Sequence, residues 1–267
     1  MAESQSIFTL FKNADEFNDY LRQTTFSRDI ELIQNHHTFL PDYKGFKTHG
    51  AFPLLHSMRN YHIKTNKWSE IGQNITTFTN GSVAICRPLN MAPACIKGAN
   101  KFGIGIEHVG NFNSGGDEMT PEHKESIVMV NAYLCAKFKL KPNTNSIVYH
   151  HWYDLNSGQR TNGTGVTKSC PGTNFFGGNT VKNANDNFIP LIVAHMQQST
   201  KQVTPTSVPV SKTVTADVLN VRSGPGLFAT ILYKISAGKT VQVFYELNGW
   251  SKISATTDEW VNSKYIN

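Results

Sequence analysis

The stretch Ile30-Glu31-Leu32-Ile33-Gln34-Asn35-His36-His37 has the pattern of a strand that ends in two histidines. The apolar residues at 30, 32 and 33 are typical of strands. A second strand pattern, Ile147-Val148-Tyr149, also ends in two histidines, His150 and His151. Because side chains alternate between the faces of a strand, we expect one member of the second pair to face a cleft.

The segment Lys168-Ser169-Cys170-Pro171-Gly172 adds a thiol to these imidazoles. A thiolate and two imidazoles from distant stretches form the ligand set of a zinc ion that keeps one position open for water. Hydrolysis at such a site also needs a base and a donor for the oxyanion. Glu107, the one carboxylate in the apolar run 104–110, is the candidate base, and Lys168 is the candidate donor. Each residue alone is more often structural, so the joint pattern carries the prediction of a metal hydrolase.

Further patterns predict alternating helices and strands up to residue 198. Helical spacing covers 15–21 and 54–62, Asn80-Gly81 is typical of a hairpin turn, and Thr120-Pro121-Glu122 is typical of a helix start. A closing helix is expected at 184–198. The pattern predicts an α/β fold with a central mixed β-sheet flanked by helices.

The composition changes at residues 199–212, where Thr204-Pro205-Thr206-Ser207-Val208-Pro209 has no apolar periodicity. This stretch predicts a linker. Short β-rich pieces separated by turns follow, and they predict a small all-β barrel at 213–267. We therefore expect a catalytic domain at 1–198, a linker at 199–212 and a second domain at 213–267.

Composition and charge exclude several classes of protein. The formal charge of +6 favours anionic partners, but no run of Lys or Arg indicates nucleic-acid binding, so we expect none. We expect no membrane insertion, because no apolar run approaches the roughly 20 residues that span a bilayer. The first residues lack a signal-peptide pattern, so we expect secretion by another route or release at lysis. Cys86 and Cys95 are a candidate disulfide pair, and we expect a monomer.

Several motifs together resemble one known family. Residues 33–41 are similar to the first metal motif of the zinc-dependent N-acetylmuramoyl-L-alanine amidases, the amidase family shared by phage endolysins, bacterial autolysins and animal peptidoglycan recognition proteins. The other motifs fall in the family's order over residues 28–195: Met58–His62, Trp68–Asn74, Gly103–Phe112 and Lys168–Gly172. The resemblance implies a peptidoglycan recognition protein-like amidase fold.

The resemblance also implies a ligand set and a reaction. His36, His150 or His151, and Cys170 would hold Zn²⁺, and Glu107 and Lys168 would be catalytic. His37 is expected on the other side of the strand from His36. The family further implies substrate-binding roles for His37, Gln73, Asn74 and Asn100. Many members have Tyr where Gln73 stands, which places more of the proton transfer on Glu107. The implied reaction is hydrolysis of the amide between N-acetylmuramic acid and L-alanine of the stem peptide.

The C-terminal stretch Leu219–Gly226 resembles the opening of bacterial SH3-like domains, and Asn248–Ile253 and Glu259–Val261 match the rest of that pattern. The resemblance implies that this domain also binds peptidoglycan and tethers the enzyme to the cell wall. Two alternatives stay open: a catalytically silent recognition protein and a metallopeptidase of the stem or cross-bridge. The sequence does not separate a phage endolysin from a bacterial autolysin.

Overall fold

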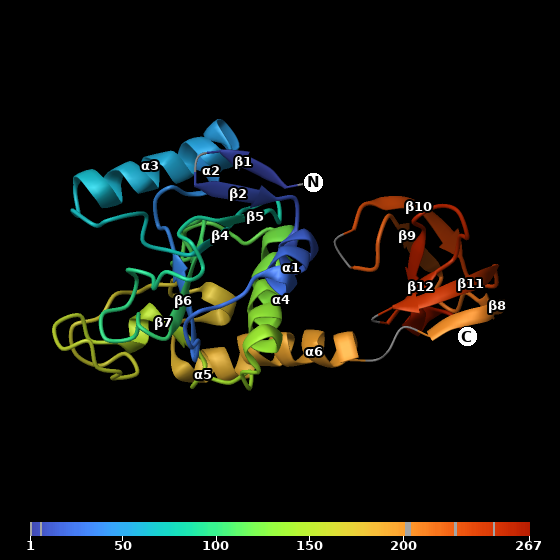
Figure 1. The fold of residues 1–267 in the computed structure, drawn as a ribbon. Helices are drawn as coiled ribbons and strands as arrows, with labels where there is room; N and C mark the ends of the chain where they lie inside the picture. The colour runs from blue at the N-terminus through green and yellow to red at the C-terminus, as the bar shows by residue number, and fades with distance from the viewer. Residues whose placement is uncertain (1, 6, 201–203, 227–228, 248) are drawn as a thin grey trace. The chain divides into compact units, whose positions relative to one another are not determined.

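The computed structural model describes residues 2–5, 7–200, 204–226, 229–247 and 249–267. Contacts divide the chain into two units, Met1–Val193 and Ala194–Asn267. The first unit has a central sheet with helices on both faces, and the second consists mainly of strands (Figure 1). No helix in these ranges has the length and apolar character that a bilayer span requires.

The sheet of the first unit is mixed, with strand order β1-β2-β5-β4-β6-β3-β7. Its central strands β4, β6, β3 and β7 are parallel to their neighbours in this group, whereas β1, β2 and β5 add antiparallel pairs. The predicted mixed sheet is therefore confirmed. The strands are β1 (Glu3–Gln5), β2 (Phe8–Phe11), β3 (Leu32–His37), β4 (Ile75–Thr77), β5 (Val83–Ile85), β6 (Gly103–His108) and β7 (Ile147–Tyr149).

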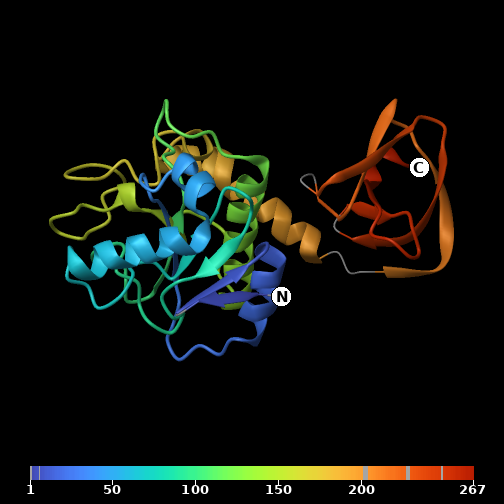
Figure 2. The ribbon, with the colours of Figure 1, turned by 90° about the horizontal axis from the view of Figure 1, so that it is seen from above.

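Helices cover both faces of this sheet (Figure 2). On one face, Leu54, Leu55 and Met58 of α3 pack against Phe78 and Ala84. On the other face, α4 contacts the strands through buried side chains such as Asn131, and α1 packs on α4. The helices are α1 (Ala14–Gln23), α2 (Tyr43–His49), α3 (Ala51–Lys64), α4 (Pro121–Phe138), α5 (Val181–Asn183) and α6 (Ile189–Thr200).

Local signals explain where several of these elements begin and turn. Thr120 caps α4 by accepting a hydrogen bond from the backbone N–H of His123, and Pro121 occupies the first turn. Gly81 has a φ of 82° in the turn between β4 and β5, a conformation that glycine adopts without steric cost. The predicted closing helix is divided into α5, a π-helical turn at Ala184–Phe188 and α6.

The second unit forms an antiparallel sheet with strand order β10-β9-β13-β12-β11-β8. Its core contains Val214, Leu219, Val221, Val243, Val261 and Ile266. This all-β architecture confirms the predicted SH3-like class. The strands are β8 (Thr204–Thr213), β9 (Val218–Arg222), β10 (Ile231–Ser236), β11 (Thr240–Leu247), β12 (Trp250–Lys252) and β13 (Trp260–Asn262).

The prediction of a linker at 199–212 is wrong for residues 204–212, because these residues belong to strand β8. Residues 204–213 pair antiparallel with β11, from Glu246↔Thr204 to Thr240↔Thr213. Backbone hydrogen bonds to an existing strand explain this result, because such pairing does not require the apolar periodicity on which the prediction relied. The part of the expected linker at 201–203 lies outside the described residues.

Candidate active site

A cleft of about 1060 Å³ opens at the ends of β3 and β6, on the face of the sheet that α3 covers. Strand β3 contributes His36 and His37, and β6 contributes Glu107. In this register His36 lies directly beside Glu107. The other lining residues include Met58 and Tyr61 of α3, the loop residues Phe39 and Trp68, and the segment from Lys168 to Cys170.

His36, His150 and Cys170 come together in this cleft. Their ligand atoms all lie within 4.8 Å of one another, and all three residues are buried. The Sγ of Cys170 is 3.4 Å from Nδ1 of His36. Nitrogen and sulfur ligands around one tetrahedral zinc ion lie about 3.5 Å apart, so this separation fits a shared ion.

The electrostatic setting of the three side chains also fits a metal site. Nδ1 of His36 faces the Sγ of Cys170 and is therefore the ring nitrogen placed to bind an ion, while the buried Nε2 has no hydrogen-bond partner among the described residues. Burial lowers the pKa of His36 well below its usual value and that of His150 to about 4, so both rings are neutral and present lone pairs. Burial raises the pKa of the Cys170 thiol. A bound cation would oppose that effect by favouring the thiolate.

His150, and not His151, belongs to this group. The two residues lie in a 3-10 turn that follows β7, so strand alternation no longer determines their directions. His151 turns toward the loop, where its Nδ1 is 2.7 Å from the backbone oxygen of Lys168. Its backbone N–H also donates to the carbonyl of Cys170 at 2.7 Å. His151 therefore supports the segment that carries Cys170.

Glu107 and Lys168 both line the cleft beside these residues. Oε2 of Glu107 is buried without a hydrogen-bond partner. Desolvation raises the pKa of Glu107 to about 8, and the Lys168 charge opposes this shift. A carboxylate that titrates close to neutral pH can both accept and return a proton.

His37 and Gln73 lie in the cleft as well. The sequence places His37 on the opposite side of the strand from His36, and β3 keeps its register through His37, which pairs with His108. His37 still lines the cleft because it is the last residue of the strand. Nδ1 of His37 accepts a hydrogen bond from the backbone N–H of Phe112 at 3.1 Å, which leaves the proton on Nε2. Nε2 of Gln73 donates to Thr76 Oγ1 at 3.0 Å, while its buried Oε1 has no partner.

Asn74 and Asn100 are not among the described residues that line the cleft. Asn74 donates to the carbonyls of Pro88 and Met91 and accepts from the N–H of Gly105. The side chain of Asn100 accepts from the N–H groups of Cys95 and Ile96. Both carboxamides thus order loops that border the cleft.

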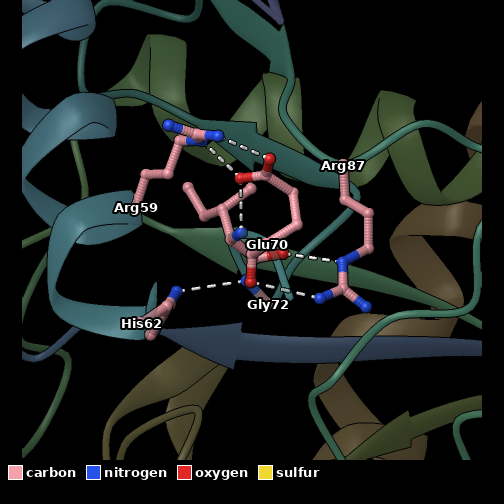
Figure 3. Close-up of polar contacts among 6 residues, drawn as sticks. Arg59, His62, Glu70, Gly72 and Arg87 are labelled. Carbon is pink, nitrogen blue, oxygen red and sulfur yellow. Dashed lines mark hydrogen bonds and ion pairs between the residues drawn. The ribbon is translucent and has the colours of Figure 1, made fainter. Parts of the chain in front are cut away.

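A group of polar contacts holds the segment that leads to Gln73 (Figure 3). Arg59 of α3 makes a bidentate ion pair with Glu70, at 2.5 and 2.8 Å. Arg87 donates to the carbonyls of Glu70 and Ile71, and His62 accepts from the N–H of Gly72. The motifs at 58–62 and 68–74 therefore meet in space and fix one wall of the cleft.

Some lining residues carry no signal of their own in the sequence. Cys95 lines the cleft, and its pKa is raised by burial and by the nearby Glu107. It does not pair with Cys86, because both thiols are free. Phe39 and Tyr61 supply exposed apolar surface at the rim. Only the folded chain brings these residues to the cleft.

Comparisons with known proteins agree with this geometry. Residues 26–173 match the family model described as N-acetylmuramoyl-L-alanine amidase, and residues 217–267 match that of the bacterial SH3 domain. No curated protein matches the chain.

Solved structures with similarity to the chain include amidases and recognition proteins. The N-acetylmuramoyl-L-alanine amidase LysC from Clostridium intestinale URNW is 24% identical, with a TM-score of 0.42, over 55% of this chain and 80% of that one. Drosophila PGRP-LB is 16% identical, with a TM-score of 0.43, over 56% and 78%. Human PGRP-IBETAC, solved with glycosamyl muramyl pentapeptide, is 19% identical, with a TM-score of 0.40, over 51% and 80%.

The chain belongs to the N-acetylmuramoyl-L-alanine amidase family, because that family's model matches more than half of it. It is a peptidoglycan hydrolase that cleaves the amide between N-acetylmuramic acid and L-alanine, and it carries a bacterial SH3 domain at its C-terminal end.

Proposed function

We propose that His36, His150 and Cys170 hold a zinc ion, and that Glu107 and Lys168 carry out the proton transfer and charge stabilisation around it. The observation that supports this most directly is the convergence of two neutral imidazoles and one thiol within 4.8 Å. Two nitrogens and one sulfur match zinc better than magnesium or calcium, which prefer oxygen ligands. When bound, zinc polarises the scissile carbonyl and activates a water molecule.

Glu107 acts as the proton carrier in this proposal. Its carboxylate takes a proton from the attacking water and gives one to the nitrogen of the leaving alanine. The register beside His36 and the raised pKa, about 8, support this role. Gln73 offers no phenol at the neighbouring position, so Glu107 is the one titratable group proposed for this step.

Lys168 and His37 interact with substrate oxygens. The Lys168 ammonium, two residues before Cys170, stabilises the negative charge that develops on the carbonyl oxygen. His37 remains neutral, since burial lowers its pKa to about 4, and its Nε2–H is available as a hydrogen-bond donor. Gln73 Oε1 is a buried acceptor without a partner and is available to a substrate N–H.

In this proposal a catalytic domain covers residues 1–198, and a wall-binding domain covers residues 204–267, because β8 belongs to the second sheet. The second unit has a small groove that includes Tyr245, Lys252 and Trp260. Aromatic rings with a nearby cation form a surface for peptide or glycan. Binding there raises the local concentration of the catalytic domain at an insoluble substrate. In this proposal the enzyme works as a monomer and acts on the bacterial cell wall.

Product analysis tests the proposed reaction. Purified peptidoglycan is digested with the zinc-loaded enzyme, and the fragments are identified by mass spectrometry. We expect glycan fragments with free lactyl carboxyl groups and stem peptides with a free N-terminal L-alanine. Peptides cut between two amino acids would instead identify a metallopeptidase. Tight binding of muropeptides without any cleavage would identify a recognition protein.

A further inference from the structure

A continuous chain of buried polar side chains lies behind the active site, on the face of the sheet that α4 covers. Tyr43 OH is 2.9 Å from Nδ1 of His123, and Nε2 of His123 is 2.8 Å from Thr77 Oγ1. Thr77 Oγ1 is also 2.8 Å from Nδ1 of His108. Nε2 of His108 is 3.0 Å from Asn35 Oδ1.

The chain ends on α4. Asn35 and Asn131 exchange two hydrogen bonds, at 3.0 and 2.9 Å, and Asn131 Nδ2 also donates to the carbonyl of Ile127. His123, Thr77, His108, Asn35 and Asn131 all have 0% exposure, so water does not compete with these contacts. A buried network in which every member is satisfied makes a structure rigid.

The donor and the acceptor of each hydrogen bond in this network can be assigned in one consistent order. At one end the backbone N–H of Thr120 donates to the Tyr43 oxygen, so the Tyr43 hydroxyl is free to donate to His123. At the other end the bond from Asn131 to the Ile127 carbonyl fixes the orientation of both carboxamides. Asn35 Oδ1 is then an acceptor, and His108 donates to it from Nε2.

Both imidazoles must be neutral for this order, with one nitrogen donating and the other accepting. Burial lowers the pKa of His123 to about 3 and that of His108 well below its usual value. His123 then donates to Thr77, and Thr77 donates to His108. The order therefore runs unbroken from Tyr43 to Asn131.

This network reaches the two strands at the residues next to the active site. Asn35 precedes His36 on β3, and His108 follows Glu107 on β6. Alternation places Asn35 and His108 behind the sheet, with His36 and Glu107 in the cleft. β3 ends at His37 and β6 at His108, and backbone hydrogen bonds continue just beyond them, from Thr38 to His108 and from Val109 to Thr77. The side-chain network therefore adds a second set of links between the strands where the regular ladder ends.

From this geometry we infer that Asn35, His108 and Thr77 are positioning residues, which fix the metal ligand His36 relative to the carboxylate of Glu107. The link of Asn35 to His108 joins β3 to β6, and Thr77 joins β6 to β4 and, through His123, to α4. This inference depends on the proposed roles of His36 and Glu107. Small displacements of reacting groups lower the rate strongly, and they do not require loss of the fold.

The test is Thr77→Val, which removes the central hydroxyl and keeps the shape of the side chain. With saturating Zn²⁺ and a soluble N-acetylmuramoyl-L-alanyl peptide, we expect kcat to fall about tenfold and KM to stay nearly unchanged. We expect the Zn²⁺ dissociation constant, measured by chelator competition, to rise by about tenfold as well. Thr77→Ser keeps the hydroxyl and is expected to restore both values.

Val130→Ala is the matched control. It removes packing from the buried face of α4, the helix that carries His123 and Asn131, and the side chain of Val130 makes no polar contact. It is expected to lower the melting temperature without changing kcat or the Zn²⁺ dissociation constant. Tyr43→Phe removes the first hydroxyl of the network and touches no strand, so it serves as the second variant if Thr77→Val does not fold. Tyr43→Phe is expected to lower kcat and to raise the Zn²⁺ dissociation constant, as Thr77→Val does.

Wild-type kcat and Zn²⁺ affinity in folded Thr77→Val, or in Tyr43→Phe where Thr77→Val does not fold, would overturn the inference. Equal losses in Val130→Ala at the same loss of melting temperature would also overturn it, since general destabilisation would then explain the effect. Failure of the proposed function gives a different result, because the wild type itself would release no L-alanyl peptide. In that case the Zn²⁺ dissociation constants of Thr77→Val and Val130→Ala still test the inference, because a rise in Thr77→Val alone supports it.

Discussion

The Sγ atom of Cys170 lies 3.4 Å from Nδ1 of His36, although 134 positions separate the two residues in the sequence. The contact joins the end of β3 to the loop after the 3-10 turn at His150–Trp152. Three segments that are distant in the chain thus meet at the proposed metal ligands. Each ligand can be tested separately.

The two histidines that follow β7 are expected to differ in their effect on metal binding. His150→Ala removes a proposed ligand, so we expect the purified variant to lose its zinc and its activity. His151→Ala is expected to retain zinc, because this ring faces the Lys168 carbonyl and not the ligand group. Elemental analysis of both proteins measures this difference. Zinc loss in His151→Ala with retention in His150→Ala would reverse the assignment.

Glu107→Gln preserves the shape of the side chain but removes the base. We expect kcat to fall by a factor of about 10² to 10⁴, the usual contribution of general acid-base catalysis. Zinc content is expected to match the wild type, since Glu107 is not one of the three ligands. Rates of hydrolysis on a soluble muramyl peptide provide the measurement. Wild-type rates in this variant would exclude Glu107 from the mechanism.

Gln73→Leu tests whether the unpartnered oxygen in the cleft wall binds substrate. The change also removes the buried hydrogen bond from Nε2 to Thr76 Oγ1, so we expect a folded protein whose melting temperature falls by only a few degrees. If Gln73 Oε1 accepts a substrate N–H, kcat/KM falls by about tenfold, which corresponds to roughly 1.4 kcal/mol. Unchanged kcat/KM would show that Gln73 is a structural residue.

Stability is expected to fall in acid because His123 is buried and neutral. Its folded pKa, about 3, lies below the unfolded value of 6.5, so the unfolded state binds more protons between these pH values. This single group lowers the free energy of unfolding by up to about 1.4 kcal/mol for each pH unit below 6.5. His123→Gln has no proton to gain at this position.

Urea unfolding at several pH values measures the effect of His123. We expect the loss of stability between pH 6.5 and pH 4 to be smaller in His123→Gln than in the wild type. His108 is the exception among the other histidines, because the charge of His123 lowers the pKa of His108, so the difference reports His123 together with its coupling to His108. Parallel curves for the two proteins would contradict the prediction.

The groove of the second unit is expected to contribute to wall binding only. Tyr245 packs edge-on against Trp260, with the ring centroids 5.8 Å apart. Tyr245→Ala is expected to weaken sedimentation with purified cell walls and to leave hydrolysis of a soluble muramyl peptide unchanged. Wild-type sedimentation would place the wall-binding surface elsewhere.

The sequence predicted much of the fold, because strand patterns, caps and turns are local. Thr120, Asn80-Gly81 and the apolar residues at the start of β3 each give a signal that depends on neighbours within a few residues. The structure departs from these predictions where local order ends. His150 and His151 follow the end of β7 in a 3-10 turn, so alternation could not tell which of them faces the cleft.

Other features depend on contacts between distant segments. Strand β8 has no apolar periodicity and forms by pairing with β11, so its composition resembles that of a linker. The network from Tyr43 to Asn131 joins residues from α2, β3, β4, β6 and α4, and no spacing in the sequence indicates it. Cys95 also reaches the cleft only because distant segments of the chain come together.

The metal content of the purified protein tests the central claim most directly. Elemental analysis of the wild type and of Cys170→Ala is compared with hydrolysis of cell walls by the same samples. We expect about one zinc ion per wild-type chain, as three protein ligands define a single site. Cys170→Ala is expected to contain almost none and to be inactive. Full hydrolysis by wild-type protein that contains no metal would contradict the account.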